Sequence, residues 1–232
     1  MTQSSSNEDT RVRNRALVIG ASGGIGAELC AALSGRGAEV TGLSRSADGI
    51  DFADPNTVRS RLEALSGPFG TILIASGMLA PQGARPEKSL SEIDASRMAE
   101  VMATNAIGPA QVLRHVPRLL PRNGRSVVGV LTARVGSIGD NRLGGWYSYR
   151  ASKAAANQIV HTAAIEIART HPGALVVALH TGTVATEFTR DYPAHRKVAP
   201  AEAAGNLLGV LDGLEPQQTG QFFDWAGKPV PW

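Results

Sequence analysis

With 232 residues, of which 43% are hydrophobic and 19% charged, the chain is long enough for one large domain with a substantial core. The net charge of +3 is spread along the sequence without interleaved aromatic residues, which argues against a nucleic-acid-binding surface. The single Cys30 excludes an internal disulfide, the five histidines lack metal-ligand spacing, and no apolar run is long enough for a bilayer. We therefore expect a cytoplasmic protein with no metal, membrane or nucleic-acid partner.

After a polar, Ser-rich stretch over 1–14, expected to be a flexible tail, short apolar runs alternate with helical patterns. The apolar runs predict buried strands at 15–20, 39–43, 71–75, 126–131, 175–179 and 221–223. Helical spacing predicts helices at 25–34, 55–65, 91–120, 149–169 and 201–211. Strands that are apolar on both faces and alternate with helices indicate an α/β fold. We expect a doubly wound, mostly parallel sheet with helices on both faces, a Rossmann fold built as a single domain over 15–232.

Two local signals refine the predicted helices. Asp54 followed by Pro55 is typical of a helix N-cap and first helical residue. Gly108 followed by Pro109 predicts a disturbance inside the helical pattern over 91–120, because Pro lacks an N–H group and disfavours a helix interior.

A glycine-rich loop with GxxxGxG spacing lies between the first predicted strand and the first predicted helix. The backbone must turn sharply there, and the N-terminus of the helix offers free N–H groups and the positive end of a dipole. In this strand–turn–helix context, the glycines predict a site for the pyrophosphate of a dinucleotide. We assign this role to Gly20, Ser22, Gly23, Gly24, Ile25 and Gly26.

The residues after the second predicted strand distinguish between nicotinamide cofactors. A ribose with a free 2′-hydroxyl calls for an acidic partner at this place, whereas a 2′-phosphate calls for a cation. The strand ends in Leu43, Ser44 and Arg45 with no acid beside them, so Arg45 can bind a phosphate and Ser44 can add a hydroxyl. We predict NADP(H) rather than NAD(H). The missing acid also argues against a methyltransferase-like Rossmann domain.

Tyr149 and Lys153 lie four residues apart at the start of an Ala-rich helical pattern. Positions i and i+4 share one face of a helix, so both side chains reach the same space. An adjacent cation favours a phenolate, and Lys153 is therefore expected to lower the pKa of Tyr149. Because neither Tyr147 nor Tyr192 has a lysine four residues further on, Tyr149 is the candidate for proton exchange with a reacting oxygen.

The GxxxGxG loop and the YxxxK pair together resemble the short-chain dehydrogenase/reductase family, and further matches cover almost the whole chain after the tail. Asp51 follows a short expected third strand, where the family places an Asp against the adenine. The stretch 74–77 stands where the family has Asn-Asn-Ala-Gly, and Thr181-Gly182 stands where it has Pro-Gly beside the nicotinamide. The resemblance implies a Rossmann fold and a nicotinamide cofactor. The further cofactor contacts that it implies are Asp51, Phe52, Ala75, Ser76, Gly77, Tyr149, Lys153, Gly182, Val184 and Thr186.

The resemblance also implies catalytic roles for three residues. Tyr149 protonates a carbonyl oxygen during reduction or takes a hydroxyl proton during oxidation. Lys153 holds the nicotinamide ribose and depresses the Tyr149 pKa, and Asn105 supports a water in the proton path.

The catalytic Ser of the family falls on Ala133 in this chain. Thr132 beside it and Ser137 beyond the next glycine are the two hydroxyls that can polarise the carbonyl in its place. Ser137 lies twelve residues before Tyr149, close to the usual spacing of the family, and is favoured on that ground. Thr132 faces the site only if the strand has already bent at that point.

These observations predict an NADP(H)-dependent oxidoreductase that interconverts a carbonyl and an alcohol on a small-molecule substrate. The stretches 144–153 and 223–232 look like the C-factor subgroup of the family, which has been linked to cell signalling. The alternative is therefore a nucleotide-binding signalling protein with weak or no turnover. Ala133 supports that alternative, whereas the intact Tyr149–Lys153 pair opposes it.

Two expectations concern the surroundings of the site. The segment 186–200 follows the nicotinamide turn and has no helical periodicity, so we expect it to border the substrate as a mobile lid. The helix over 149–169 carries apolar residues such as Ile159 and Ile165 on more than one face, which predicts a homodimer or homotetramer.

Overall fold

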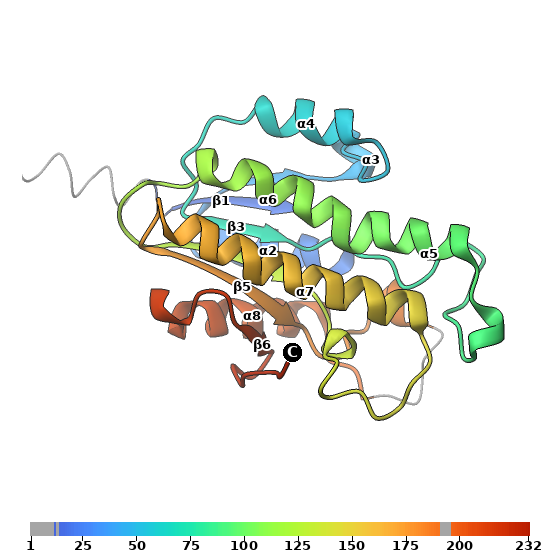
Figure 1. Ribbon diagram of the computed structural model, residues 1–232. Helices are drawn as coiled ribbons and strands as arrows, with labels where there is room; N and C mark the ends of the chain where they lie inside the picture. The colour runs from blue at the N-terminus through green and yellow to red at the C-terminus, as the bar shows by residue number, and fades with distance from the viewer. Residues whose placement is uncertain (1–11, 13, 191–195) are drawn as a thin grey trace, which may run out of the picture.

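The computed structural model describes residues 12, 14–190 and 196–232, so most of the predicted tail lies outside the described residues. Within them, six parallel strands form one sheet in the order β2-β1-β3-β4-β5-β6 (Figure 1). The chain runs outward from β1 to β2 and then crosses to β3 on the other side of β1, which is the predicted doubly wound topology. The strands are β1 (Arg15–Ile19), β2 (Glu39–Leu43), β3 (Thr71–Ile74), β4 (Ser126–Leu131), β5 (Ala174–His180) and β6 (Phe222–Asp224).

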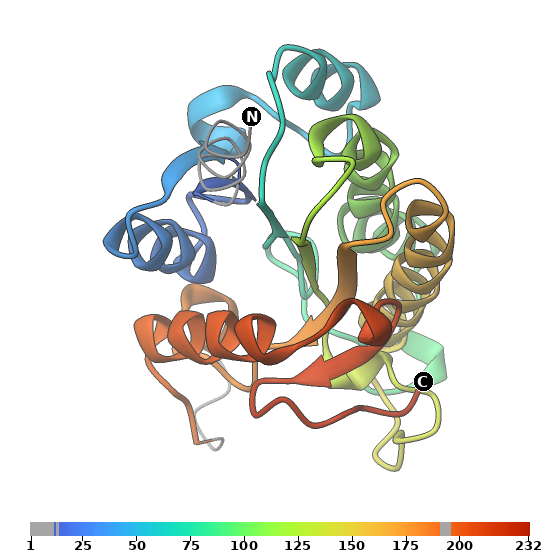
Figure 2. The ribbon, with the colours of Figure 1, turned by 90° about the vertical axis from the view of Figure 1, so that its left-hand side faces the viewer.

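The sheet lies between two layers of helices (Figure 2). Successive residues of a strand point to opposite faces, so each strand contributes to two cores. Leu17 and Ile19 pack beneath one layer, whereas Ala16 and Val18 pack beneath the other. The first layer consists of α4 (Pro55–Glu63), α6 (Gly108–Leu119) and α7 (Tyr147–Ala168), and the second of α2 (Gly24–Gly35) and α8 (Pro200–Gly213).

The helix predicted over 91–120 is divided into several pieces. A 3-10 turn at Leu90–Glu92 is followed by α5 (Ala95–Met102), a π-helix at Ala103–Ile107 and then α6. Because Pro109 has no N–H, the carbonyl of Asn105 lacks its usual i+4 donor, and the wider π-helix falls at this place. The predicted disturbance at Gly108-Pro109 is therefore confirmed, and the uninterrupted helix is not.

The short third strand expected before Asp51 is wrong: the described residues form a helical turn there, α3 (Arg45–Asp48). Ser44 caps this turn with its side chain, which draws the chain out of the sheet directly after β2. Asp54 and Pro55 begin α4 as predicted. The remaining 3-10 turns are Arg134–Gly136, Glu187–Thr189 and Pro216–Gln218.

Candidate active site

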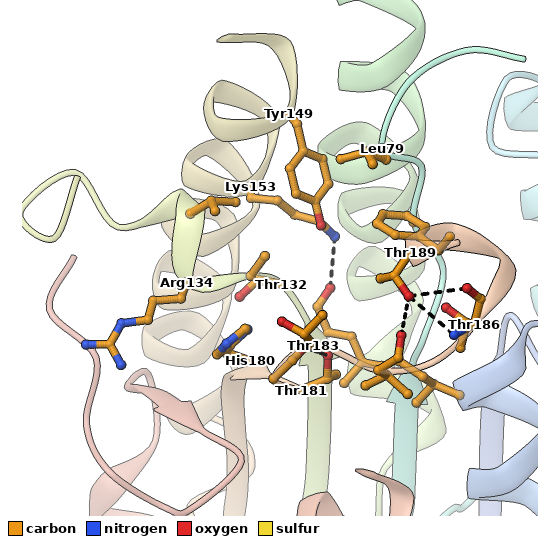
Figure 3. A pocket seen from close by; sticks show the side chains of 18 of the residues that line it. Leu79, Thr132, Arg134, Tyr149, Lys153, His180, Thr181, Thr183, Thr186 and Thr189 are labelled. Atoms are coloured by element: carbon orange, nitrogen blue, oxygen red, sulfur yellow. Dashed lines mark hydrogen bonds between the residues drawn. The ribbon is translucent and has the colours of Figure 1, made fainter. Parts of the chain in front are cut away.

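A cavity of about 660 Å³ opens at the carboxyl ends of the strands (Figure 3). Its walls come from the loops after β1, β3, β4 and β5 and from the first turns of α7. Ligands of open parallel sheets bind at this edge, where the strand order reverses. The predicted residues that line the cavity are Gly23, Gly24, Ile25, Ala75, Ser76, Gly77, Thr132, Tyr149, Lys153, Gly182, Val184 and Thr186. The predicted residues that lie outside its described lining are Gly20, Ser22, Gly26, Ser44, Arg45, Asp51, Phe52, Asn105 and Ser137.

Gly20 and Gly24 of the glycine-rich loop are packed too closely against their neighbours to accept a Cβ atom. Gly20 has a positive φ of 88°, and a Cβ atom on it would lie 2.9 Å from the backbone nitrogen of Ser76. A Cβ atom on Gly24 would lie 2.7 Å from Cγ2 of Thr186. The loop therefore brings the N-terminus of α2 to the cavity, with its N–H groups available to an anion.

Tyr149 and Lys153 extend from the first two turns of α7 into the cavity and are both buried. The Lys153 ammonium donates a hydrogen bond to the carbonyl oxygen of Leu131 at 3.1 Å. Burial lowers the pKa of Lys153 to about 8. Burial raises the pKa of the Tyr149 phenol, which is opposite to the lowering predicted from Lys153 alone. The reason is that desolvation disfavours both charged forms, and its extent is not visible in the sequence.

Asn105 lies in the π-helix and holds the loop after β3 against α7. Its amide nitrogen donates to the carbonyl oxygen of Met78 at 2.7 Å and to Oγ of Ser152 at 3.0 Å. Its amide oxygen accepts from the N–H of Met78 at 2.7 Å. Both N–H donors of the Asn105 amide therefore have protein partners. The side chain joins the loop after β3 to α7, the helix that carries Lys153.

The two candidate hydroxyls occupy different environments. Thr132 lines the cavity, is only 5% exposed, and has no hydrogen-bond partner for Oγ1 within the described part of the chain. Ser137 is buried, lies outside the described lining, and accepts the N–H of Asp140 at 3.1 Å through Oγ. The geometry therefore favours Thr132 as the hydroxyl that replaces the catalytic Ser, at whose position this chain has Ala133. The spacing in the sequence favoured Ser137.

The residues predicted for the adenosine end lie around α3. Oγ of Ser44 accepts the N–H of Ala47 at 3.2 Å, and the Ser44 N–H donates to the Asp48 carboxylate at 2.8 Å. Asp48 is thus an acid beside Ser44 that the sequence analysis missed, because it reaches back over the helical turn. Arg45 is exposed at the first position of α3.

Asp51 and Phe52 also have partners within the protein. One Asp51 carboxylate oxygen accepts the N–H of Ala53 at 3.0 Å. The Phe52 ring is buried against Gly108 of α6 and belongs to the core. The ring of Phe52 therefore stabilises the fold, and a contact of Phe52 with the cofactor stays a prediction.

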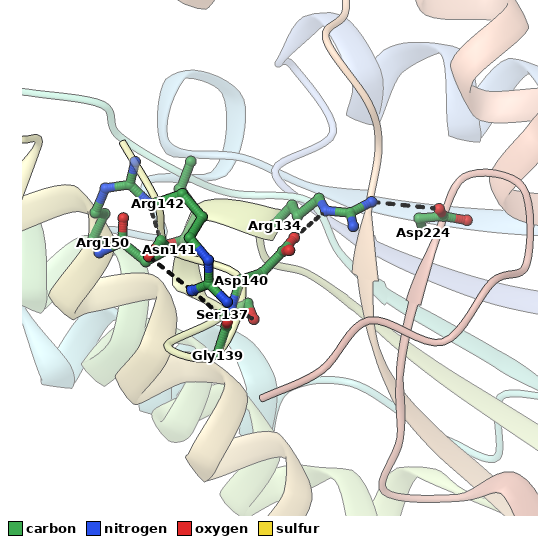
Figure 4. A network of polar contacts seen from close by, with 9 residues as sticks. Arg134, Ser137, Gly139, Asp140, Asn141, Arg142, Arg150 and Asp224 are labelled. Atoms are coloured by element: carbon green, nitrogen blue, oxygen red, sulfur yellow. Dashed lines mark hydrogen bonds and ion pairs between the residues drawn. The ribbon is translucent and has the colours of Figure 1, made fainter. Parts of the chain in front are cut away.

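His180 is a cavity residue that carries no family motif in the sequence. Burial and the neighbouring Arg134 guanidinium lower the pKa of His180 to about 4, and the Asp224 carboxylate partly opposes them. The imidazole is therefore neutral near pH 7. Arg134 pairs with Asp140 at 2.5 Å and with Asp224 at 4.0 Å, and it links the loop after β4 to β6 (Figure 4).

Aromatic rings flank Tyr149 at the wall of the cavity. Trp146 meets its ring edge-on at 6.1 Å between centroids, and Phe188 lies 5.9 Å away. Leu79 adds further apolar surface. Trp146 has φ 54° and ψ 45°, a left-handed conformation that is rare for a bulky side chain and costs about 1–3 kcal/mol. Trp146 lies in the stretch 144–153 that resembles the C-factor subgroup, whereas Leu79 and Phe188 belong to no motif. Their meeting around Tyr149 depends on the tertiary fold.

The cavity fits a nicotinamide dinucleotide. Ser76 Oγ and Thr132 Oγ1 are buried at its wall and lack a partner among the described residues, although buried hydroxyls normally have one. The N-terminus of α2 suits a pyrophosphate, and the Lys153 ammonium suits a ribose hydroxyl.

Over the described ranges 12, 14–190 and 196–232, no cluster of three or more His, Cys, Asp or Glu could hold a metal ion. In the same ranges, no helix is both long and apolar enough to cross a membrane.

The doubly wound sheet, the glycine loop at α2 and the buried Tyr149–Lys153 pair define a Rossmann-type oxidoreductase. Comparison with known proteins makes this class more specific. A family model described as short chain dehydrogenase matches residues 49–197, and the chain belongs to the short-chain dehydrogenase/reductase family, as its motifs predicted.

Two relatives resemble the chain over more than half of its length. The chain is 34% identical over 229 residues to the 1-hydroxy-2-glutathionyl-2-methyl-3-butene dehydrogenase of Rhodococcus sp. (strain AD45), and the match covers 93% of this chain and 98% of the relative. The chain is 36% identical over 144 residues to the C-signal protein of Myxococcus xanthus, and the match covers 62% of this chain and 84% of the relative.

Two solved structures with NADP have the same fold. One is described as a short-chain dehydrogenase/reductase from Burkholderia multivorans, with a TM-score of 0.79, 26% identity, and coverage of 95% of this chain and 100% of that one. The other is a carbonyl reductase from Pseudomonas aeruginosa PAO1, with a TM-score of 0.77, 25% identity, and coverage of 94% and 99%.

Proposed function

We propose that the protein is an NADP(H)-dependent oxidoreductase that interconverts a carbonyl and an alcohol on a small molecule. The observation that carries this proposal is the buried phenol of Tyr149 at the cavity wall beside Lys153. Because its pKa is raised, the phenol keeps its proton near pH 7 and can give it to a carbonyl oxygen. The Rhodococcus relative is named a dehydrogenase and the Pseudomonas structure a carbonyl reductase, which supports this reaction class.

Each residue of the site has a distinct role in this proposal. A bound nicotinamide supplies a hydride to the carbonyl carbon or accepts one from the alcohol carbon. Tyr149 donates its phenolic proton to the carbonyl oxygen during reduction and is left as a phenolate. During oxidation the reverse occurs, and the phenolate of Tyr149 takes the hydroxyl proton of the alcohol. Thr132 donates a hydrogen bond from its hydroxyl to the same oxygen, in the role of the Ser that Ala133 replaces. Lys153 holds the ribose, and Asn105 holds the wall behind Lys153.

NADP(H) is proposed over NAD(H) on the basis of Arg45. This exposed cation at the start of α3 follows β2, where a 2′-phosphate would lie. Ser44 contributes less than the sequence predicted, because Asp48 already accepts its N–H and lies 3.4 Å from its hydroxyl. The two NADP-containing structures above are consistent with the proposal.

The cavity also limits the substrate. Leu79, Trp146 and Phe188 give the substrate side an apolar wall, and His180 is neutral there. A small carbonyl compound with an apolar body fits these surroundings best. Of the segment 186–200 that we predicted as a lid, residues 191–195 lie outside the described residues.

We also propose a homodimer or homotetramer that uses the exposed surface of α6 and α7. A groove between these helices is lined by apolar residues such as Leu113 and Ile159, and Ile165 on α7 is 50% exposed. Light scattering at micromolar concentration tests this proposal, and a monomeric mass contradicts it. The cytoplasmic location stays a prediction from the sequence.

Consumption of NADPH by the purified protein with a panel of aldehydes and ketones tests the proposed function. Turnover that depends on Tyr149 supports it. The second candidate, a nucleotide-binding signalling protein, is favoured by Ala133 at the position of the catalytic Ser and by the similarity to C-signal. Tight binding of NADPH without turnover of any carbonyl on the panel would support that candidate instead.

A further inference from the structure

The helix that carries Tyr149 and Lys153 begins with an unusual turn. Gly144 and Gly145 have φ of 65° and Trp146 has φ of 54°, so three successive residues are left-handed before α7 starts. The N-cap position is occupied by Trp146, whose indole has no acceptor for the N–H groups of the first helical turn. A helix usually obtains this acceptor from a local Ser, Thr, Asp or Asn.

The acceptor comes instead from Glu87, which lies 61 residues before Ser148 in the chain. One Glu87 carboxylate oxygen accepts the Ser148 N–H at 3.2 Å, and the other accepts the Ser148 hydroxyl. The main-chain oxygen of Glu87 accepts the Trp146 N–H at 2.5 Å. Glu87 is only 7% exposed, so its charge lies buried at the positive end of α7, where it is stabilised.

Arg150 holds the same turn from the side of α7. Its Nε donates to the carbonyl oxygens of Gly144 and Gly145 at 3.2 and 3.0 Å. The left-handed residues are therefore fixed by α7 itself and by Glu87, which approaches from the segment before α5. Trp146 in turn meets the Tyr149 ring and lines the cavity. Glu87 thus contacts Trp146, and Trp146 contacts the ring of Tyr149.

We propose that Glu87 is a positioning residue, which holds the left-handed Trp146 turn and thereby places the Tyr149 phenol for proton transfer. This inference rests on the proposed role of Tyr149 as proton donor. Loss of the Glu87 carboxylate releases the first turn of α7, and small displacements of a reacting group have large effects on rate. Within the described part of the chain, the polar contacts of Glu87 are with Trp146 and Ser148 and not with the glycine loop, so cofactor affinity is expected to stay near the parent value.

Steady-state kinetics of Glu87→Ala, Glu87→Gln and Glu100→Ala tests the proposal, with NADPH and the best carbonyl of the panel. Glu100 is an exposed acid of α5 and serves as the matched control. We expect kcat of Glu87→Ala to fall by roughly ten- to a hundredfold while KM for NADPH stays near the parent value. Glu87→Gln keeps an acceptor for Ser148 and should recover most of the rate, and Glu100→Ala should match the parent.

Hydrogen exchange measured by mass spectrometry gives a readout that needs no substrate. In Glu87→Ala, the amide of Ser148 loses its acceptor and should exchange faster, whereas the later turns of α7 should keep their protection. Unchanged exchange at Ser148 overturns the proposal, and so does faster exchange throughout the protein, which would indicate general destabilisation.

The outcomes separate this inference from the proposed function. If Tyr149→Phe loses activity and Glu87→Ala keeps the parent kcat, the positioning role is wrong and the proposed function stands. If Tyr149→Phe keeps the parent rate, the proposed function itself fails and the positioning role fails with it. Should Glu87→Ala not fold, Ser148→Ala removes one partner of the carboxylate, and a parent kcat in that variant overturns the proposal.

Discussion

The Lys153 ammonium lies 5.8 Å from the centre of the Tyr149 ring, one helical turn further along α7. The carbonyl oxygen of Leu131 holds it there from the end of β4. Both side chains are buried, so the same desolvation raises the pKa of the phenol and lowers that of the ammonium to about 8. The pair is therefore a neutral phenol beside an ammonium that loses its proton more easily than usual. Both properties have measurable consequences.

The stability of the fold should depend on the titration of Lys153. Between pH 8 and 10.5, the folded protein has lost the Lys153 proton while the unfolded chain still binds it. The unfolded state then binds more protons, so the free energy of unfolding rises with pH, by at most about 3 kcal/mol. Above about pH 10 the raised pKa of Tyr149 acts in the opposite direction, because the unfolded phenol ionises first.

Urea denaturation at pH 7 to 10 measures this effect. We expect the free energy of unfolding of the parent to rise over this range relative to that of Lys153→Met, which has no proton to lose at this position. Lys228→Met, a change at an exposed lysine, is the control and should follow the parent. Parallel curves for the parent and Lys153→Met would contradict the assigned burial of the charge.

The parts of the site that the sequence predicted depend on short spacings. The glycine loop and the Tyr149–Lys153 pair each occupy one local element, so a pattern of a few residues already determines which groups face each other. The doubly wound sheet was also predictable, because strands that are apolar on both faces must be covered on both sides. In these places local spacing and the tertiary fold agree.

The parts that the sequence did not predict depend on contacts between distant segments. Glu87 meets the start of α7 across 61 residues, and His180 acquires its low pKa from burial and from Arg134. Asp48 is only four residues from Ser44, but it reaches Ser44 through a helical turn, whereas a short strand was predicted before Asp51. Burial and the course of the main chain determine the contact of Glu87, the pKa of His180 and the contact of Asp48. A short sequence motif specifies neither of these causes.

The choice between the two candidate hydroxyls has a clear experimental signature. Thr132→Val removes a hydroxyl that lines the cavity without a described partner, so the rate should fall by roughly two decades. The free energy of unfolding should stay equal or rise, since an unpaired buried hydroxyl costs stability. Ser137→Ala removes the acceptor of the Asp140 N–H and should lower the free energy of unfolding by about 1 kcal/mol. The catalytic rate of Ser137→Ala should equal that of the parent. Kinetics and denaturation of both variants provide the measurement, and a rate loss confined to Ser137→Ala would restore the assignment from the sequence.

Arg45 should determine the preference for NADPH over NADH. A charge-assisted contact with the 2′-phosphate contributes about 1.5–3 kcal/mol, so Arg45→Ala should weaken NADPH binding by about one to two decades. NADH affinity should change little. Asp48→Asn is the complementary variant, because it removes a negative charge near the same phosphate and should strengthen NADPH binding. Calorimetric titration of both cofactors measures the preference, and an equal loss for the two cofactors in Arg45→Ala would exclude the phosphate contact.

Tyr149→Phe tests the proton donor itself. The substitution removes one hydroxyl from a buried ring whose contacts with Trp146 and Phe188 remain, so the fold and the cofactor affinity should persist. The rate should fall by roughly two to four decades, the usual contribution of a positioned acid–base group. Tyr147→Phe is the matched control, because Tyr147 belongs to the same helical turn but lies outside the described lining of the cavity, and it should keep the parent rate. Circular dichroism and NADPH titration establish that the variant is folded and binds the cofactor. Turnover by Tyr149→Phe at the parent rate would remove the basis of the proposed enzyme, and the nucleotide-binding signalling protein would then account better for Ala133 and the similarity to C-signal.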